Sequence, residues 1–80
     1  MTLTYGEKAE AKLTGTILRV LRSGRARYAL SAGATTTACC TAMSVMASDA
    51  GVTDSQFGSW LRTIAVSVEH GDKDFQGLLN

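Results

Sequence analysis

Apolar residues recur at helical intervals in the first quarter of the chain and predict a helix there. Thr4 and Glu7 have the T-x-x-E spacing of a capping box, in which hydroxyl and carboxylate bind the unpaired backbone N–H groups of a helix start. Ser23-Gly24 supplies a stop, because glycine accepts the left-handed conformation that ends helices. We therefore expect a helix over residues 4–22, with an apolar face made by Ala9, Leu13, Ile17, Val20 and Leu21.

A β-hairpin is the alternative for residues 16–31. Two arms, residues 16–22 and 25–31, flank Ser23-Gly24 and alternate in part between apolar and polar positions. The first arm also continues a capped helical pattern, so the helix is favoured and the hairpin stays open as the competing interpretation.

Two further helical stretches are predicted before residue 50. Gly33 interrupts the pattern and leaves a short segment over residues 25–32 and a longer helix over about 36–50. The three threonines at 35–37 are weak helix formers but good helix starters. Asp49-Ala50-Gly51 marks the next break.

The best-marked helix follows Thr53. Thr53 and Gln56 have the spacing of a second capping box, and His70-Gly71 is the expected end. Residues 74–79 are expected to add a last turn. The prediction is an all-α compact bundle of four to five short helices in a single domain over residues 1–80. The apolar stripe of this helix consists of Phe57, Trp60, Leu61, Ile64, Ala65 and Val68.

Composition supports a small helical globular domain. The 80 residues include no proline, and 45% are hydrophobic against 19% charged. A chain of this length buries only about two-thirds of the surface that it exposes when unfolded, so its core is small. Association into a homo-oligomer would enlarge that core.

The net charge of +1 conceals an asymmetry. Residues 1–48 carry six basic and two acidic side chains, whereas residues 49–80 carry two basic and five acidic ones. The basic half is a candidate surface for phosphates or for an acidic protein partner. Its candidate contact residues are Arg19, Arg22, Arg25 and Arg27.

Little in the sequence favours catalysis, a metal or a membrane. Cys39 and Cys40 are adjacent, which suits neither an ordinary disulfide nor a metal site, and His70 is distant in sequence. The uncharged stretch 28–48 consists mainly of small residues, too weakly apolar for a membrane span. No signal-peptide pattern is present at the N-terminus. We therefore expect a non-enzymatic cytoplasmic protein with no cofactor, metal or membrane partner.

The corner between the last two long helices fills the positions of a helix-turn-helix over residues 43–68. That motif needs a small residue where the helices approach, a glycine at the turn, an apolar residue sealing it, a hydroxyl cap and apolar anchors one turn apart. These roles fall to Ala47, Gly51, Val52, Thr53, Phe57 and Trp60, with Met46 and Ala50 facing inward from the first helix.

The run G-V-T-D-S-Q-F-G-S-W-L-R resembles the helix-turn-helix of small bacterial and phage transcription regulators, and is similar to that of the lysogeny-establishing activators of lambda-like phages. The resemblance spans residues 43–62. It rests on Gly51, Val52, Ser55, Gln56, Trp60 and Arg62, which match the pattern G-V-x-x-S-Q-x-x-x-W-x-R.

The resemblance implies a DNA-binding transcription regulator that binds double-stranded DNA with its second helix, as a homodimer on two half-sites. The residues expected to contact DNA are Thr53, Ser55, Gln56, Ser59 and Arg62.

The chain departs from the regulators in having few cations on this helix. Asp54, Ser59 and Leu61 occupy positions where lysine or arginine is common in them, so only Arg62 remains to neutralise phosphate. This departure keeps a second function class open. In that alternative, the chain is a small helical protein-protein interaction module, such as a phage-type inhibitor or adaptor, that does not bind DNA.

Overall fold

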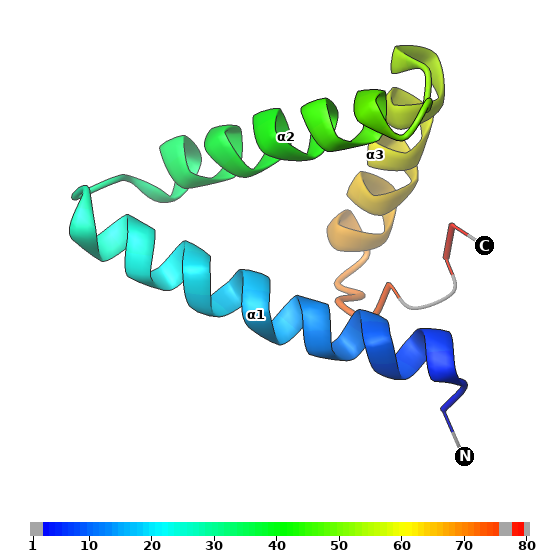
Figure 1. The fold of residues 1–80 in the computed structure, drawn as a ribbon, viewed down its shortest axis with the longest axis horizontal. Coiled ribbons are helices and arrows are strands. Elements are labelled where there is room, and N and C mark those ends of the chain that lie inside the picture. Colours follow the sequence, from blue (N-terminus) through cyan, green and yellow to red (C-terminus); the bar gives the residue numbers. More distant parts are fainter. Residues whose placement is uncertain (1–2, 76–77, 80) are drawn as a thin grey trace. The chain divides into compact units, whose positions relative to one another are not determined.

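Three helices make up the regular secondary structure of the described residues. The computed structural model describes residues 3–75 and 78–79. Helix α1 comprises Tyr5–Arg27, α2 comprises Ala32–Asp49 and α3 comprises Asp54–Glu69 (Figure 1). Within these described ranges there is no strand. The all-α class is confirmed, but the described residues form three helices rather than the four or five that were predicted.

The chain divides into two compact units, Met1–Met43 and Ser44–Asn80. The first holds α1 and the start of α2, and the second holds the last turns of α2 together with α3. The corner between α2 and α3 therefore lies wholly within the second unit. The grouping of all 80 residues into a single domain stays a prediction.

Helix α1 begins at the predicted capping box. The backbone N–H of Glu7 donates to Thr4 Oγ1 at 3.1 Å, and the backbone N–H of Thr4 donates to Glu7 Oε1 at 3.3 Å. Two N–H groups that the helix itself leaves unpaired are thus bonded by the two side chains. The predicted start at Thr4 is confirmed.

The predicted end of this helix at Ser23-Gly24 is wrong, because α1 continues to Arg27. The hairpin over residues 16–31 is also wrong, since these residues are helical as far as Arg27. A glycine inside a helix costs only about 1 kcal/mol relative to alanine, and the good helix formers Arg25, Ala26 and Arg27 follow it. The backbone hydrogen bonds gained by continuing outweigh that cost.

Helix α1 ends with an alanine in the position that usually holds glycine. Ala29 has a φ of 53°, in the left-handed region. The Leu30 N–H donates to the Arg25 carbonyl at 3.0 Å and the Ala29 N–H to the Ala26 carbonyl at 3.4 Å. This pairing is a Schellman motif. Because alanine rarely takes this conformation, the sequence gives no sign of the true end.

Replacing Ala29 with glycine is expected to raise the free energy of unfolding by about 1 kcal/mol. The left-handed conformation costs an alanine about 1–2 kcal/mol, and the freedom of glycine in the unfolded chain offsets part of that gain. Denaturant unfolding followed by circular dichroism measures the change. The matched control is Ala26→Gly inside α1, which is expected to lower stability by a similar amount. A loss of stability in Ala29→Gly would contradict the prediction.

Helix α2 begins at Ala32, earlier than predicted. Ser31 precedes it, and the Ser31 hydroxyl accepts the Ala34 N–H at 3.0 Å. This cap lets the helix pass through Gly33 without interruption. The predicted short helix over 25–32 and the start at residue 36 are therefore wrong, because those residues are shared between α1, its end and α2.

Threonine hydroxyls in the helices turn back to their own backbone. In α2, the hydroxyls of Thr35, Thr36, Thr37 and Thr41 each donate to the carbonyl four residues earlier, at 2.9–3.0 Å. Thr14 and Thr16 in α1 and Thr63 in α3 do the same. The donor hydrogen of each of these hydroxyls is thus used within its own helix, while the oxygen can still accept a hydrogen bond.

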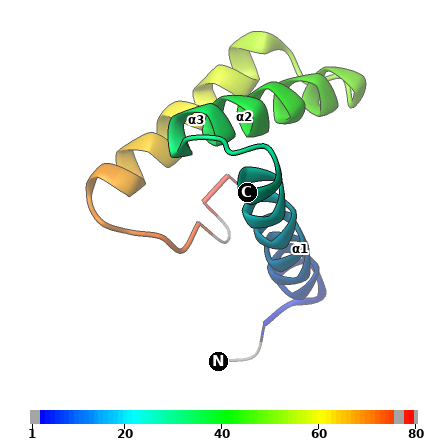
Figure 2. The same cartoon turned by 90° about the vertical axis from the view of Figure 1, so that its left-hand side faces the viewer.

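Helix α3 ends where the sequence predicts, at His70-Gly71. Gly71 has a φ of +83°, and the Asp72 N–H donates to the Ser67 carbonyl at 3.0 Å. Residues 70–75 then continue as a loop (Figure 2). Of the predicted last turn, residues 78–79 form a turn, whereas residues 76–77 lie outside the described residues.

Candidate nucleic-acid interface

Backbone hydrogen bonds fix the corner between α2 and α3. The Val52 N–H donates to the Ala47 carbonyl at 2.9 Å, and the Gly51 N–H donates to the Ser48 carbonyl at 3.0 Å. These two bonds form a Schellman motif, with Gly51 in the left-handed conformation at φ +82°. Gly51 thus makes the turn that its position in the sequence predicts, and Val52, half-buried, follows it.

Ala47 is the most buried residue of the corner, with 3% of its surface exposed. Among the described residues it alone is buried. Ser44, three residues earlier on the same side of α2, is half-buried. Its role as the small residue where the two helices approach each other stays a prediction.

The inward orientation predicted for Met46 and Ala50 is wrong. Met46 is 59% exposed, and Ala50 is exposed as well. Met46 precedes Ala47 by one residue, which turns its side chain about 100° around the helix and away from the buried side. Ala50 is the last residue before the turn, where α2 has already ended.

Thr53 joins the corner to α3. Its hydroxyl accepts the Gln56 N–H at 3.1 Å, and its backbone is extended, as in a helix N-cap. Asp54 follows in the first turn, where its carboxylate is favoured by the positive end of the helix dipole. The start of α3 is therefore fixed by the Thr53 side chain, and the Thr53 oxygen already serves the helix itself.

One side of α3 is partly covered and another is open. Phe57, Trp60, Leu61 and Ile64 are half-buried, which confirms the predicted stripe at these positions, whereas Ala65 and Val68 are exposed. All five residues predicted to contact DNA are exposed: Thr53, Ser55, Gln56, Ser59 and Arg62.

Ser55, Ser59 and Arg62 form a single row along α3, because they are spaced by four and three residues. A Cβ atom built on Gly58 would lie 3.7 Å from Arg62 Nη1, so the guanidinium lies back over Gly58, toward the start of the helix. The absence of a side chain at Gly58 leaves room there. The row thus presents two hydroxyls and one cation on the open side of α3.

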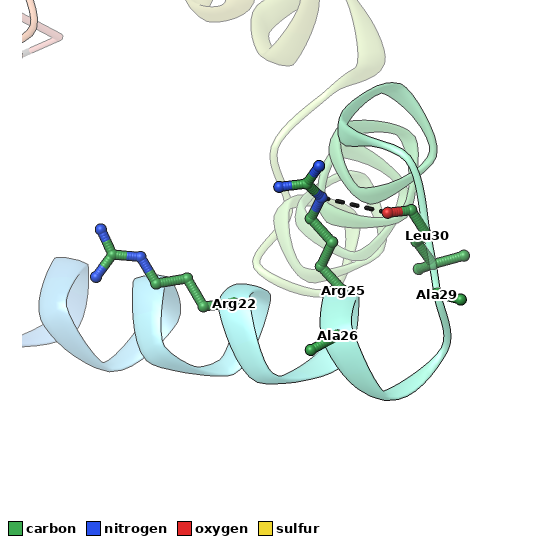
Figure 3. A pocket seen from close by; sticks show the side chains of 5 residues that line it. All are labelled: Arg22, Arg25, Ala26, Ala29 and Leu30. Carbon is green, nitrogen blue, oxygen red and sulfur yellow. Dashed lines mark hydrogen bonds between the residues drawn. The ribbon is translucent and has the colours of Figure 1, made fainter.

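The four arginines predicted to contact phosphate do not share one surface. Arg22 and Arg25 line one shallow hollow at the end of α1, whereas Arg19 and Arg27 line another. Arg25 Nε donates to the Leu30 carbonyl at 3.2 Å, as Figure 3 shows. The Arg27 guanidinium lies 5.8 Å from the centroid of the Tyr28 ring, a cation–π contact. Arg25 and Arg27 thus contact groups at the end of their own helix.

Four exposed cations form a longer basic row along α1, on the side away from its apolar residues. Lys8, Lys12, Arg19 and Arg22 are spaced by four, seven and three residues, which places them along one side of the helix. All four are exposed. The spacing in the sequence already predicts this placement, and we call these four residues the α1 basic row. It belongs to the first unit, whereas the α3 row belongs to the second.

Metal and membrane sites find no support in the described part of the chain. No group of three His, Cys, Asp or Glu side chains there could hold a metal ion. None of the helices described is long and apolar enough to cross a membrane. Cys39 and Cys40 are half-buried free thiols.

Comparison with protein-family models, with curated proteins and with solved structures finds no match. The chemistry of the described residues is therefore the basis on which a function can be argued.

Proposed function

We propose that this protein is a small DNA-binding transcription regulator in which α2, the turn at Gly51 and α3 act as a helix-turn-helix. The observation that carries the proposal is the corner itself. It is closed by two backbone hydrogen bonds beside the buried Ala47 and capped by Thr53, while one side of α3 stays open. A recognition helix needs this combination of a fixed base and a free polar side.

The open side of α3 offers groups that suit contacts with a duplex. Arg62 can bind a phosphate or the O6 and N7 acceptors of guanine, and Gln56 can bind adenine. The hydroxyls of Ser55 and Ser59 can donate to phosphates or to base edges. With Arg62 as its one cation, α3 would gain more of its affinity from hydrogen bonds than such helices usually do.

One recognition helix contacts few base pairs, so we propose that the protein binds as a homodimer on two half-sites. Phosphate contacts beyond α3 fall to the arginines of α1, in particular Arg19 and Arg22 on the α1 basic row.

Fluorescence anisotropy with a pool of random duplex DNA, at low and at near-physiological salt, tests the proposal. Binding is expected at low salt and should weaken steeply as salt rises, because phosphate contacts release counterions. The double variant Ser59→Ala/Arg62→Ala is expected to bind about tenfold more weakly. The slope of log affinity against log salt should decrease by about one as the Arg62 contact is lost.

The matched control is Lys73→Ala, which removes one exposed cation from the same unit but lies outside α3. It is expected to keep most of the affinity. Equal losses in the two variants would mean that net charge, rather than the α3 row, governs binding. No binding at low salt would reject the proposed function.

The exposed faces of α1 favour a second candidate function, a protein-protein interaction module of the inhibitor or adaptor type. The α1 basic row suits an acidic protein surface. Salt-sensitive binding to an acidic protein partner, together with no binding to DNA, would support this candidate over the first.

A further inference from the structure

Helix α1 carries an apolar face that its own unit leaves uncovered. Leu13 is 58% exposed, Ile17 41% and Val20 64%. Ala9, Leu13, Ile17 and the half-buried Leu21 are spaced by four residues, and Val20 follows Ile17 by three, so these residues share one side of the helix. One charged residue, Glu10, lies on this side as well, seven residues before Ile17. We call this the α1 apolar face. Since α1 runs unbroken to Arg27, the face extends over most of its length.

The apolar face and the basic row lie on nearly opposite sides of α1. Arg19 follows Ile17 by two residues, and Arg22 follows Val20 by two, which corresponds to about 200° around a helix. A partner that covers the apolar face would therefore leave the basic row open. It would also not need to be acidic itself.

The charges beside the apolar face indicate what covers it. Glu7 and Arg25 are eighteen residues apart, about five turns, so they lie on the same flank of α1, at opposite ends. In an antiparallel helix pair, a given flank of one helix lies beside the same flank of the other. The N-terminal part of each helix then lies beside the C-terminal part of its partner. The carboxylate of Glu7 would then approach the guanidinium of Arg25 in a second copy, at both ends of the pair.

A parallel pair would be penalised by its charges. It would bring the two C-terminal ends of α1 together, each with Arg25 and Arg27 in its last turn. Like charges brought close together repel one another, which disfavours the parallel pair. The charge pattern of α1 thus complements itself in the antiparallel direction only.

We propose that two copies of this chain associate through their α1 helices, antiparallel, with Ile17 at the two-fold axis. Leu13 of one copy then faces Leu21 of the other, and the row Leu13, Ile17 and Leu21 packs at the four-residue spacing common between helices. The α1 basic rows of both copies stay exposed. This inference does not depend on whether α3 binds DNA.

Disulfide cross-linking tests the pairing and its direction. In a Cys39→Ser/Cys40→Ser background, Ile17→Cys is expected to form an interchain disulfide under mild oxidation. Leu13→Cys alone is not, because in the antiparallel pair the two positions are about 12 Å apart along the axis, beyond the reach of a disulfide. A mixture of Leu13→Cys and Leu21→Cys chains should link to each other. Links between two Leu13→Cys chains, with none between a Leu13→Cys chain and a Leu21→Cys chain, would overturn the antiparallel pairing.

Sedimentation tests the association without cysteines. The unsubstituted chain is expected at twice its mass of 8.4 kDa at high micromolar concentration. Ile17→Asp is expected to shift it to a single chain mass, while Ala11→Asp adds the same charge on another side of α1 and should remain paired. Circular dichroism checks that both variants stay helical.

A single chain mass for the unsubstituted protein would overturn the proposal, since the α1 apolar face would then be covered by something other than a second copy. If Ile17→Asp loses its helical signal, the cross-linking result decides. If the unsubstituted protein is a single chain in solution and still binds DNA, the α1 pairing fails while the proposed function stands.

Discussion

Replacing Ala47 with aspartate is expected to lower the free energy of unfolding of the second unit by about 3 kcal/mol. Ala47 is 3% exposed beside the corner between α2 and α3, so the new carboxylate would lose its water without gaining a cation. The side chain is also larger than the space that alanine occupies. Both effects act where the two helices are joined.

Denaturant unfolding followed by the fluorescence of Trp60, the single tryptophan, measures this change within the same unit. The matched control is Met46→Asp, one residue earlier at a site that is 59% exposed. It adds the same charge to the same turn of α2 and is expected to cost less than about 1 kcal/mol. Equal losses in the two variants would show that the charge itself, and not burial at Ala47, destabilises the helix.

Replacing Gly51 with valine is expected to lower the free energy of unfolding by about 2 kcal/mol or more. A β-branched residue at a φ of +82° is strained, because its side chain collides with its own backbone. No atom outside the local chain lies within 4 Å of a Cβ built at Gly51, so the cost comes from conformation and not from crowding. The strain would be relieved by losing the Val52 to Ala47 hydrogen bond and, with it, the corner.

Gly51→Asn separates these causes, because asparagine tolerates the left-handed conformation better than other side chains. It is expected to retain most of the stability in the same unfolding measurement. A loss as large as that of the valine variant would imply that the site is crowded after all. The α3 row should lose DNA binding in the valine variant and keep it in the asparagine variant, provided that the proposed function holds.

Local hydrogen-bonding signals allowed much of the fold to be predicted. Thr4 and Thr53 start their helices through short-range side-chain bonds, and Gly51 and Gly71 end theirs in the conformation that suits glycine. The end of α1 was missed because Ala29 adopts that conformation against its preference, while Gly24, a better candidate, remains helical. The residue at which a helix ends therefore depends on the backbone hydrogen bonds and residues around it as well as on its own type.

The candidate site was predictable only in part. The exposure of Ser55, Ser59 and Arg62 follows from their spacing relative to the stripe at Phe57 and Trp60. The orientation of Met46 was missed because Met46 and Ala47 are both apolar, and periodicity alone does not distinguish which of two adjacent residues is covered. The spacing of Lys8 and Lys12 relative to the apolar residues of α1 predicts that they share a side of the helix with Arg19 and Arg22.

The threonines make the surface of α2 more apolar than its amino-acid composition suggests. Each bond from a threonine hydroxyl to a carbonyl of the same helix uses the hydroxyl hydrogen and leaves the side-chain methyl group free to make apolar contacts. Thr35, Thr36 and Thr37 therefore offer a partner methyl groups and acceptor oxygens but no free donor, in a stretch that carries no charged side chain from residue 28 to 48. Hydropathy scales count each hydroxyl as fully hydrated. They therefore overestimate the free-energy cost of burying this helix against an apolar surface.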